Sequence, residues 1–448
     1  MHKRAKQLLS LTLALVLAGS MLTGCGKGSQ GKSEEAKAET EKADDDKVIT
    51  FWHIGTDEPD VSLYEDAAEA FNENTDSGYR IECVAMEADA YKEKLVIAMS
   101  SGECPDIYTS WAGGPMNEYV DAGYAQPLDD LVEQAPWKDK ILDATLEQGK
   151  YNDKIYGVGM INVSLSGIYY NKEIFEQYNL EVPTTVSELE QVCDTLVENG
   201  KIPFALANAP KWTGSMYFMN LATRKGGLEP FKNAVAGTGS FEDECFIYAG
   251  EKIQEWVQKG YFPEGVNSLD EGDGQSKQLF YSEEAAMKLI GSWESATYKA
   301  DSEEFYNKLG WFPFPAVDDS DADPSIQCGT MGDQFISFNC TGEKLDAAFE
   351  LLNYYFDDAY TQKMVDAGKI PPVKGVDQMI TGELEKEFIS KVEEASDVQL
   401  WYDQYLPPAV SSTHLDTCQE LFGLTMTPEE AAKQFQEAME TYNSEKAE

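Results

Sequence analysis

Apolar and polar positions change period in a regular order along the first third of the chain. Residues 48–54 form an apolar run typical of a buried strand, and residues 62–72 carry apolar side chains at helical spacing. Residues 79–85 are strand-like, residues 91–99 are helical, and residues 107–111 are again strand-like. This order is typical of a parallel sheet with helices on its faces. It predicts an α/β domain in which ligands bind beyond the carboxyl ends of the strands.

Residues 157–172 (GVGMINVSLSGIYYNK) are the most informative stretch of the pattern. They combine a β-prone apolar run with small polar side chains and end in the aromatic pair Tyr169 and Tyr170. A helical pattern follows at once over residues 172–178. We interpret the stretch as a strand that passes from one domain into another and carries aromatic side chains to a ligand cleft between them. An ordinary core strand with a buried tyrosine is the alternative.

The rest of the pattern predicts further elements, which we divide between two domains. Helices are expected over residues 185–198, 249–258, 345–360 and 427–442, and strands over residues 203–207, 283–290, 309–314 and 334–338. Thr185 and Glu188 form a capping box at the start of the first of these helices. We assign strands 309–314 and 334–338 to the first domain. The helix over 345–360 and the segment 371–373 are assigned to the second domain.

The N-terminus is typical of an exported protein. Residues 1–24 join a cationic start to a short apolar core, as in a signal peptide rather than a membrane-spanning helix. Residues 22–25 (LTGC) resemble the bacterial lipobox, so Cys25 is expected to carry a lipid anchor; a plain secretory signal is the alternative. Residues 25–46 are acidic and contain no aromatic side chain, which predicts a disordered linker.

Length and charge limit the possible functions. The chain has 448 residues, of which 42% are hydrophobic, and this length exceeds what one hydrophobic core usually serves. Two domains are therefore expected. The formal net charge of −45 excludes nucleic acid as a partner and disfavours anionic substrates, so a neutral or cationic ligand is favoured.

Sequence signals of catalysis are weak. The chain lacks a nucleophile elbow, no predicted strand is followed by a P-loop or a dinucleotide-binding fingerprint, and only His53 and His414 remain once the signal peptide is removed. We predict a protein that is not an enzyme and uses no cofactor and no metal. The acidic runs 270–273 and 318–323 are interpreted as solvated loops rather than calcium sites. The seven cysteines after Cys25 lack metal-ligand spacing and are interpreted mostly as buried thiols.

Aromatic side chains recur beside polar ones where the predicted strands end. A sugar packs its C–H face on an aromatic ring, while its hydroxyls need carboxylate or amide partners. Each aromatic alone is more often part of a core or a plain surface, but their repetition predicts a carbohydrate site. The candidate ligand-binding residues are Trp52, Asp57, Trp111, Tyr170, Asn208, Trp212, Trp293, Trp401 and Asp403. Trp137, Trp256 and Trp311 lie within helix-like or strand-like runs and are interpreted as structural.

Several segments, taken in order, resemble one protein family. They are the lipobox, the acidic linker, FWH at 51–53, GECPDIYTSW at 102–111, GIYYNKEIFEQYNLEVPTTVSELE at 167–190, EEAAMKLIGSWE at 283–294, WYDQYLPPAV at 401–410 and TPEEAAKQFQEAM at 427–439. Together they resemble the extracellular solute-binding proteins of carbohydrate ABC importers, the group that includes maltose-binding protein and the multiple-sugar binding lipoproteins. The resemblance covers almost the whole mature chain, and none of its motifs is specific to one sugar.

The resemblance implies a type II periplasmic-binding-protein-like α/β fold, with two lobes joined by a hinge around a ligand cleft. Lobe 1 is expected to comprise residues 47–160 and 292–340, and lobe 2 residues 161–291 and 341–448. By position, the segments at Trp52 and Trp111 would line lobe 1. Tyr170, Trp212, Trp293 and the segment 401–403 would line lobe 2 and the crossings.

The function that the resemblance implies is binding without chemistry. We expect a monomeric, lipid-anchored receptor on the outer face of the cytoplasmic membrane of a Gram-positive-like bacterium. It would close on a sugar and deliver it to the membrane permease of an ABC importer, and the several aromatics favour an oligosaccharide. The alternatives are a cell-surface glycoside hydrolase, or the same binding fold with a peptide or polyamine ligand.

Overall fold

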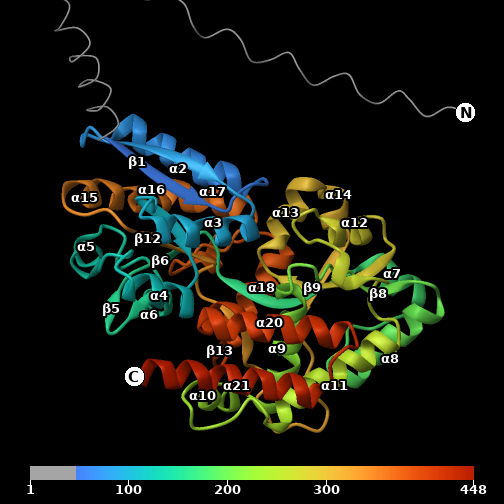
Figure 1. Ribbon diagram of the computed structural model, residues 1–448. Coiled ribbons are helices and arrows are strands. Elements are labelled where there is room, and N and C mark those ends of the chain that lie inside the picture. Colours follow the sequence, from blue (N-terminus) through green and yellow to red (C-terminus); the bar gives the residue numbers. More distant parts are fainter. Residues whose placement is uncertain (1–46, 448) are drawn as a thin grey trace, which may run out of the picture. The chain divides into compact units, whose positions relative to one another are not determined.

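The computed structural model describes residues 47–447 (Figure 1). Its first sheet has five strands in the order β2-β1-β3-β12-β6. The strands are β1 (Val48–His53), β2 (Arg80–Ala85), β3 (Ile107–Ser110), β6 (Val158–Met160) and β12 (Gln334–Phe338). β1 pairs in parallel with both β2 and β3, whereas β12 runs antiparallel to β3 and β6. The parallel start of the sheet and the return of residues 334–338 to it are confirmed. The predicted signal peptide, Cys25 and the linker lie outside the described residues.

Short helices connect the strands of the first sheet. Between β1 and β6 the chain forms α2 (Asp60–Asn74), α3 (Ala88–Ser101), α4 (Gly114–Asp121), α5 (Asp129–Gln134), α6 (Asp143–Gln148) and the hairpin of β4 (Lys150–Tyr151) with β5 (Lys154–Ile155). The Glu87 side chain caps α3 by accepting hydrogen bonds from the backbone N–H groups of Asp89 and Ala90. Gly102 ends α3 with φ 77°, a left-handed conformation that glycine adopts without a steric penalty.

The predicted helix over 345–360 is wrong in both length and place. The chain forms three helices instead: α15 (Glu343–Phe349), α16 (Leu351–Tyr355) and α17 (Asp358–Asp366). α15 packs on β12 of the first sheet, where the Phe349 and Phe338 rings lie 5.8 Å apart. α16 packs on α2: the Tyr355 hydroxyl donates to the carbonyl oxygen of Tyr64 at 3.5 Å, and the Tyr354 and Phe71 rings lie 6.3 Å apart. Asp357 starts a new helix because its side chain accepts from the N–H groups of the next turn.

Residues 371–373 are also on the first-sheet side, contrary to the prediction. The N–H of Leu142 donates to the carbonyl oxygen of Pro372 at 2.9 Å, and Val373 forms a β-bridge with Ile141. A helical period reveals which face of a helix is buried. It does not reveal which of two sheets covers that face.

A second sheet is built around β7, which has partners on both edges. Its strands are β7 (Ser164–Asn171), β8 (Ile202–Phe204), β9 (Ala285–Gly291), β10 (Leu309–Pro313), β11 (Gln327–Thr330) and β13 (Val398–Gln399). β10 runs antiparallel to β7, so the assignment of residues 309–314 to the first domain is wrong. The apolar pattern of β10 marks it as a buried strand but carries no information about its partner.

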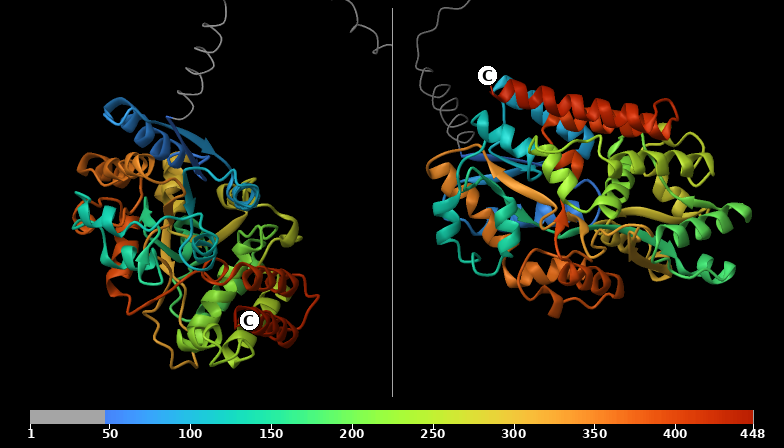
Figure 2. Two further views of the ribbon diagram at one scale, coloured as in Figure 1. Left: turned by 60° about the vertical axis from the view of Figure 1, so that its left-hand side comes forward. Right: turned by 90° about the horizontal axis from the view of Figure 1, so that it is seen from below.

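The remaining helices lie between the strands of the second sheet along the chain, or follow its last strand. They are α7 (Lys172–Tyr178), α8 (Val186–Glu198), α9 (Trp212–Gly226), α10 (Glu229–Val235), α11 (Glu244–Gln258), α12 (Gln275–Tyr281), α13 (Glu294–Asp301), α14 (Glu303–Lys308), α18 (Glu383–Glu394), α19 (Tyr402–Tyr405), α20 (Pro408–Phe422) and α21 (Pro428–Ala447), with the 3₁₀ turns η1 (Val266–Ser268) and η2 (Val376–Gln378). The capping box of Thr185 and Glu188 at the start of α8 is confirmed. α20 and α21 lie side by side (Figure 2), and the His414 and Phe435 rings stack between them at 4.7 Å.

The chain passes from the first sheet to the second between the end of β6 and the start of β7. β6 belongs to the first sheet and β7 to the second, so residues 157–172 do cross from one sheet to the other, but as two strands rather than the predicted single strand. Asn162 lies between β6 and β7 and ties this crossing to two other segments. Its carbonyl oxygen accepts from the N–H of Asp333 at 2.7 Å, and its side-chain oxygen accepts from the N–H of Ile370 at 2.7 Å. The backbone and the side chain of one buried asparagine thus hold three segments of the chain together.

Candidate functional site

Three of the predicted tryptophans form a single cluster. Trp212 opens α9, Trp293 precedes α13 and Trp401 precedes α19. The Trp293 ring lies 6.3 Å from Trp212 and 5.7 Å from Trp401, with the latter pair edge to face at 74°. Trp401 is buried, whereas Trp212 and Trp293 remain partly exposed. This tryptophan cluster therefore brings together three distant parts of the sequence and presents the aromatic surfaces of Trp212 and Trp293.

The loop after β9 fixes the position of Trp293. The indole folds back over Gly291, where a Cβ atom would come within 1.9 Å of a ring carbon, so only glycine leaves the necessary space. Ser292 ties the loop to the start of β7. Its hydroxyl donates to the carbonyl oxygen of Val163 and accepts from the N–H of Leu165, each at 3.1 Å.

A buried ion cluster includes Glu294, the residue that follows Trp293. The Lys288 ammonium on β9 is 2.7 Å from Glu271 and 3.6 Å from Glu294, and the Lys288 side chain is 2% exposed. Burial lowers the pKa of Lys288, but the two carboxylates outweigh it, so the net pKa is raised. The sequence analysis did not identify Lys288. The available signal was a single lysine inside an otherwise apolar strand.

A second aromatic group gathers at the carboxyl end of the first sheet. Trp111 is 8% exposed and contacts the Tyr91 ring edge to face at 6.3 Å, and Trp52 packs against the same small core. The Lys92 ammonium lies 4.9 Å above the Trp111 ring and 3.8 Å from an Asp89 carboxylate oxygen. Lys92 was another residue that the sequence analysis missed, because nothing in the helical pattern of α3 distinguishes it from its neighbours.

Acidic side chains surround this second group. Burial raises the pKa of Asp403, the Lys92 ammonium lowers it, and the Asp89 carboxylate raises it, which indicates that α19 faces α3 here. Burial also raises the pKa of Asp89, with further contributions from Glu87 and Asp270. The predicted residues Trp52, Trp111 and Asp403 are thus brought to one place.

Asp57 lies at the rim rather than inside the site. Its carboxylate is 75% exposed and is 3.7 Å from the ammonium of Lys277 on α12. This ion pair connects the loop after β1 to a helix of the second-sheet part of the chain. The Lys277 side chain is 18% exposed, but the Asp57 side chain is open to solvent, so screening by water keeps the contribution of this pair to stability small.

Two predicted site residues are not part of either aromatic group. Asn208 is fully buried: its side-chain oxygen accepts from the N–H of Gly214 at 2.9 Å, and its amide group donates to Asn267 at 2.8 Å. It therefore stabilises the start of α9. Tyr170 packs against Phe175 at 4.5 Å and Phe312 at 5.6 Å, at the opposite end of β7 from Ser164.

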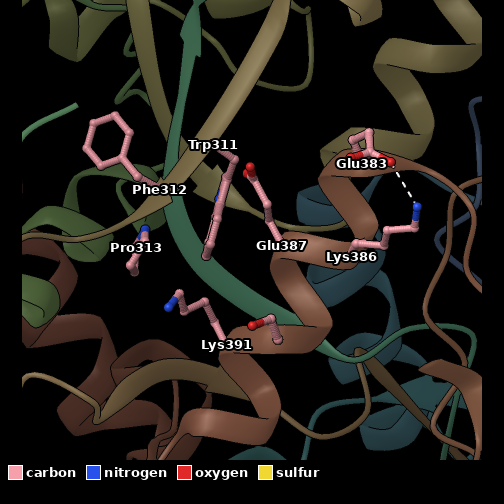
Figure 3. A pocket seen from close by; sticks show the side chains of 8 residues that line it. Trp311, Phe312, Pro313, Glu383, Lys386, Glu387 and Lys391 are labelled. Atoms are coloured by element: carbon pink, nitrogen blue, oxygen red, sulfur yellow. Dashed lines mark hydrogen bonds and ion pairs between the residues drawn. The ribbon is translucent and has the colours of Figure 1, made fainter. Parts of the chain in front are cut away.

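A surface groove of about 370 Å³ lies between β10 and α18 (Figure 3). It is lined by Trp311, Phe312, Pro313, Glu383, Lys386, Glu387, Ser390 and Lys391. Trp311 is 4% exposed and packs on Phe388, with its ring over Gly167 of β7, as expected for a structural residue. Neither aromatic group contributes a residue to this groove.

The two remaining histidines are buried and held neutral. Burial lowers the pKa of His53 to about 4 and the pKa of His414 to about 3. The His53 ring stacks on the Tyr64 ring at a centroid distance of 4.2 Å. The Nε2 atom of His414 is 2.8 Å from the Ser215 hydroxyl, and both of its ring nitrogens are 3.7 Å from the Cys418 sulfur. Both rings are fully buried core components.

A buried charged group occupies the crossings between the sheets. The Lys369 ammonium is 2.5 Å from Asp60 and its side chain is 1% exposed. Burial raises the pKa of Asp333 to about 6, the Lys369 ammonium lowers it, and Asp60 raises it.

Within residues 47–447, no helix is both long and apolar enough to cross a membrane.

Comparison with known protein sequences identifies a family. The model of the bacterial extracellular solute-binding proteins matches residues 55–362. An uncharacterized ABC transporter extracellular-binding protein of Pyrococcus horikoshii is 29% identical over 230 residues, covering 50% of each chain. The multiple sugar-binding protein of Streptococcus mutans is 27% identical over 288 residues, covering 62% of this chain and 64% of that protein. The chain thus spans about half to two thirds of the length of these curated relatives.

Comparison with solved structures identifies the fold. A structure from work on xylan utilization by the thermophilic bacterium Caldanaerobius polysaccharolyticus has a TM-score of 0.80 and 30% identity, covering 87% of this chain and 99% of that one. A chitin oligosaccharide binding protein also has a TM-score of 0.80, at 22% identity, covering 89% of this chain and 99% of that one. These neighbours are two-lobed type II solute-binding proteins, which confirms the predicted fold class.

Proposed function

The chain belongs to the family of bacterial extracellular solute-binding proteins, and we propose that it captures a sugar for an ABC importer. The tryptophan cluster of Trp212, Trp293 and Trp401 is the observation that carries this proposal. Partly exposed indoles that meet at angles offer several stacking faces to the C–H surface of a sugar. The two partly exposed indoles, Trp212 and Trp293, together offer more stacking surface than one sugar ring covers, which favours an oligosaccharide. The similar proteins are binding proteins rather than enzymes.

The proposed mechanism is closure of two lobes around the ligand. Lobe 1 contains the first sheet and contributes Trp52, Trp111 and Asp57, while lobe 2 contains the second sheet and contributes the tryptophan cluster and Asp403. The sugar contacts both lobes only when they approach, so binding favours the closed state. The tie of Asn162 to Asp333 and Ile370 supports a hinge at the crossings.

We further propose that the protein acts outside the cell. In this proposal, residues 1–24 direct export, Cys25 carries the lipid that holds the protein at the outer face of the cytoplasmic membrane, and residues 25–46 form a linker. The closed, loaded protein then docks as a monomer on the permease subunits of the importer. Radiolabelled fatty-acid incorporation into the full chain, lost in Cys25→Ala, tests the anchor.

Isothermal calorimetry with a panel of glycans tests the ligand class. The panel begins with xylo-oligosaccharides, because the similar structure at 30% identity comes from work on xylan utilization, and continues with chito-oligosaccharides and raffinose. A polyamine and a peptide mixture complete it. Saturable binding of one glycan is expected. Binding of only the amine or the peptides would retain the fold and overturn the sugar assignment.

Trp293→Ala is expected to weaken binding of that glycan about 30-fold. An indole that loses about 80 Å² of contact forfeits roughly 2 kcal/mol at about 25 cal/mol per Å². Trp293→Phe should retain most of the affinity because it keeps an aromatic face. Tyr178→Ala, a truncation of a half-buried ring at the end of α7, serves as the control. Unchanged affinity in Trp293→Ala would exclude the tryptophan cluster as the binding site.

A further inference from the structure

Lys92 covers the aromatic face that the proposed sugar would use on Trp111. Its ammonium lies 4.9 Å above the ring, within the range of an attractive cation–π contact. Trp111 also meets the Tyr91 ring at a steep angle with a centroid distance of 6.3 Å, and the Trp111 side chain is only 8% exposed. Little of the ring is left for a ligand as long as Lys92 stays where it is.

The ammonium has other partners within reach. The Asp89 carboxylate is 3.8 Å away on the preceding turn of α3, and the Asp403 carboxylate on α19 interacts with the same charge. The Lys92 side chain is 38% exposed, so its four-carbon stem has room to turn. Moving the ammonium off the ring therefore costs the cation–π contact but does not leave a charge without a counter-ion.

From this geometry we propose that Lys92 is a specificity-determining residue that competes with the ligand for Trp111. This inference rests on the proposed sugar-binding function. A ligand gains the Trp111 face only by displacing the ammonium toward Asp89 and Asp403. Short ligands that fill the tryptophan cluster alone leave Lys92 in place. Ligands long enough to reach Trp111 lose part of their stacking energy to the displacement, which sets a threshold on chain length.

The test compares Lys92→Ala with Lys94→Ala. Lys94 is on the exposed face of the same helix, so the control makes the same change in charge and in helix propensity away from Trp111. Calorimetry with a length series of the bound glycan is expected to give about tenfold tighter binding of the longer members in Lys92→Ala, since a cation–π contact of this kind is worth about 1 kcal/mol or slightly more. The shortest binding member should be unaffected, and Lys94→Ala should match the wild type throughout.

A second variant and a second readout keep the outcome unambiguous. In Asp89→Asn the displaced ammonium loses its nearest counter-ion, so longer glycans should bind several-fold more weakly than to the wild type. Acrylamide quenching of the ligand-free protein should increase in Lys92→Ala, and this increase should vanish in Lys92→Ala/Trp111→Phe, which reports the uncovered ring without any ligand.

The possible failures differ from one another. If Lys92→Ala weakens binding of every glycan, Lys92 is a direct ligand contact and the competition is overturned. If glycans bind equally to all variants, the inference fails while the proposed function stands. If no variant binds any glycan but quenching rises, the proposed function itself fails, and the inference fails with it.

Discussion

Replacing Lys288 by methionine is expected to lower the free energy of unfolding by about 3–5 kcal/mol. The ammonium is almost completely buried between Glu271 at 2.7 Å and Glu294 at 3.6 Å. Methionine fills a similar volume, so the change leaves little cavity and mainly removes the charge. Two carboxylates then remain close together in a place that excludes water, and each lacks its counter-ion.

Urea denaturation at neutral pH measures this loss. The control is Lys433→Met, which breaks the exposed pair with Glu437 at 3.5 Å and should cost no more than about 0.5 kcal/mol. The double variant Lys288→Met/Glu271→Gln removes one of the uncompensated charges and should regain a large part of the stability. A loss in Lys288→Met as small as in the control would mean that the cluster is hydrated and does not support the loop of Trp293.

The same variant also tests how Trp293 is held. Glu294 follows Trp293 directly, and its pairing with Lys288 orients the start of α13 beneath the tryptophan cluster. Once the pair is lost, Glu294 is free to turn toward solvent and to carry the backbone of Trp293 with it. We therefore expect a change in the near-ultraviolet circular dichroism of Lys288→Met that Lys433→Met does not produce.

Replacing Asp333 by asparagine is expected to raise the free energy of unfolding by up to about 3 kcal/mol above pH 7. Burial raises the pKa of the Asp333 carboxyl from 3.8 to about 6, even though the Lys369 ammonium lowers it. The folded state thus binds the Asp333 proton more tightly than the unfolded state does. Stability from this group is present at low pH and is lost as the pH rises from about 4 to about 6, since the carboxylate must then be buried charged.

The surroundings of Asp333 tolerate the neutral amide. Lys369 keeps its ion pair with Asp60 at 2.5 Å, so the change does not leave a buried ammonium unpaired. Asp60 and Tyr64 are the other ionisable groups that face Asp333, and the removal of its negative charge relieves repulsion with Asp60. Asparagine also keeps an oxygen and a similar shape beside Ser164 and Gln334.

Denaturation at two pH values checks this expectation. The gain in Asp333→Asn should be largest at pH 7.5 and should shrink to about 0.5 kcal/mol near pH 4, where the wild-type carboxyl is already protonated in the folded state. Asp319→Asn, in an exposed loop, is the matched control and should change stability little at either pH. A destabilised Asp333→Asn at pH 7.5 would mean that the charged pair with Lys369 outweighs the cost of burial.

Features that depend on a few neighbouring residues were determined by the sequence. The capping box of Thr185 and Glu188 begins α8 as predicted, because its hydrogen bonds form within one turn. The strand β12 and the helix α7 match the predicted ranges 334–338 and 172–178 for the same reason. The placement of Trp212, Trp293 and Trp401 after predicted elements also indicated the tryptophan cluster, although these residues are far apart in the chain.

Features that depend on distant partners were decided only by the tertiary structure. β10 pairs with β7 rather than with the first sheet, and α16 packs on α2, since an apolar face specifies burial without specifying its neighbour. Asn208 is buried, and its side-chain oxygen accepts a hydrogen bond from the backbone N–H of Gly214 near the start of α9. The pairing of Lys288 with Glu271 and the position of Lys92 over Trp111 depend on side chains that meet only after folding. A single lysine in an apolar strand marked Lys288 as unusual, but electrostatic interactions act through space, so no local pattern in the chain could have revealed its partners.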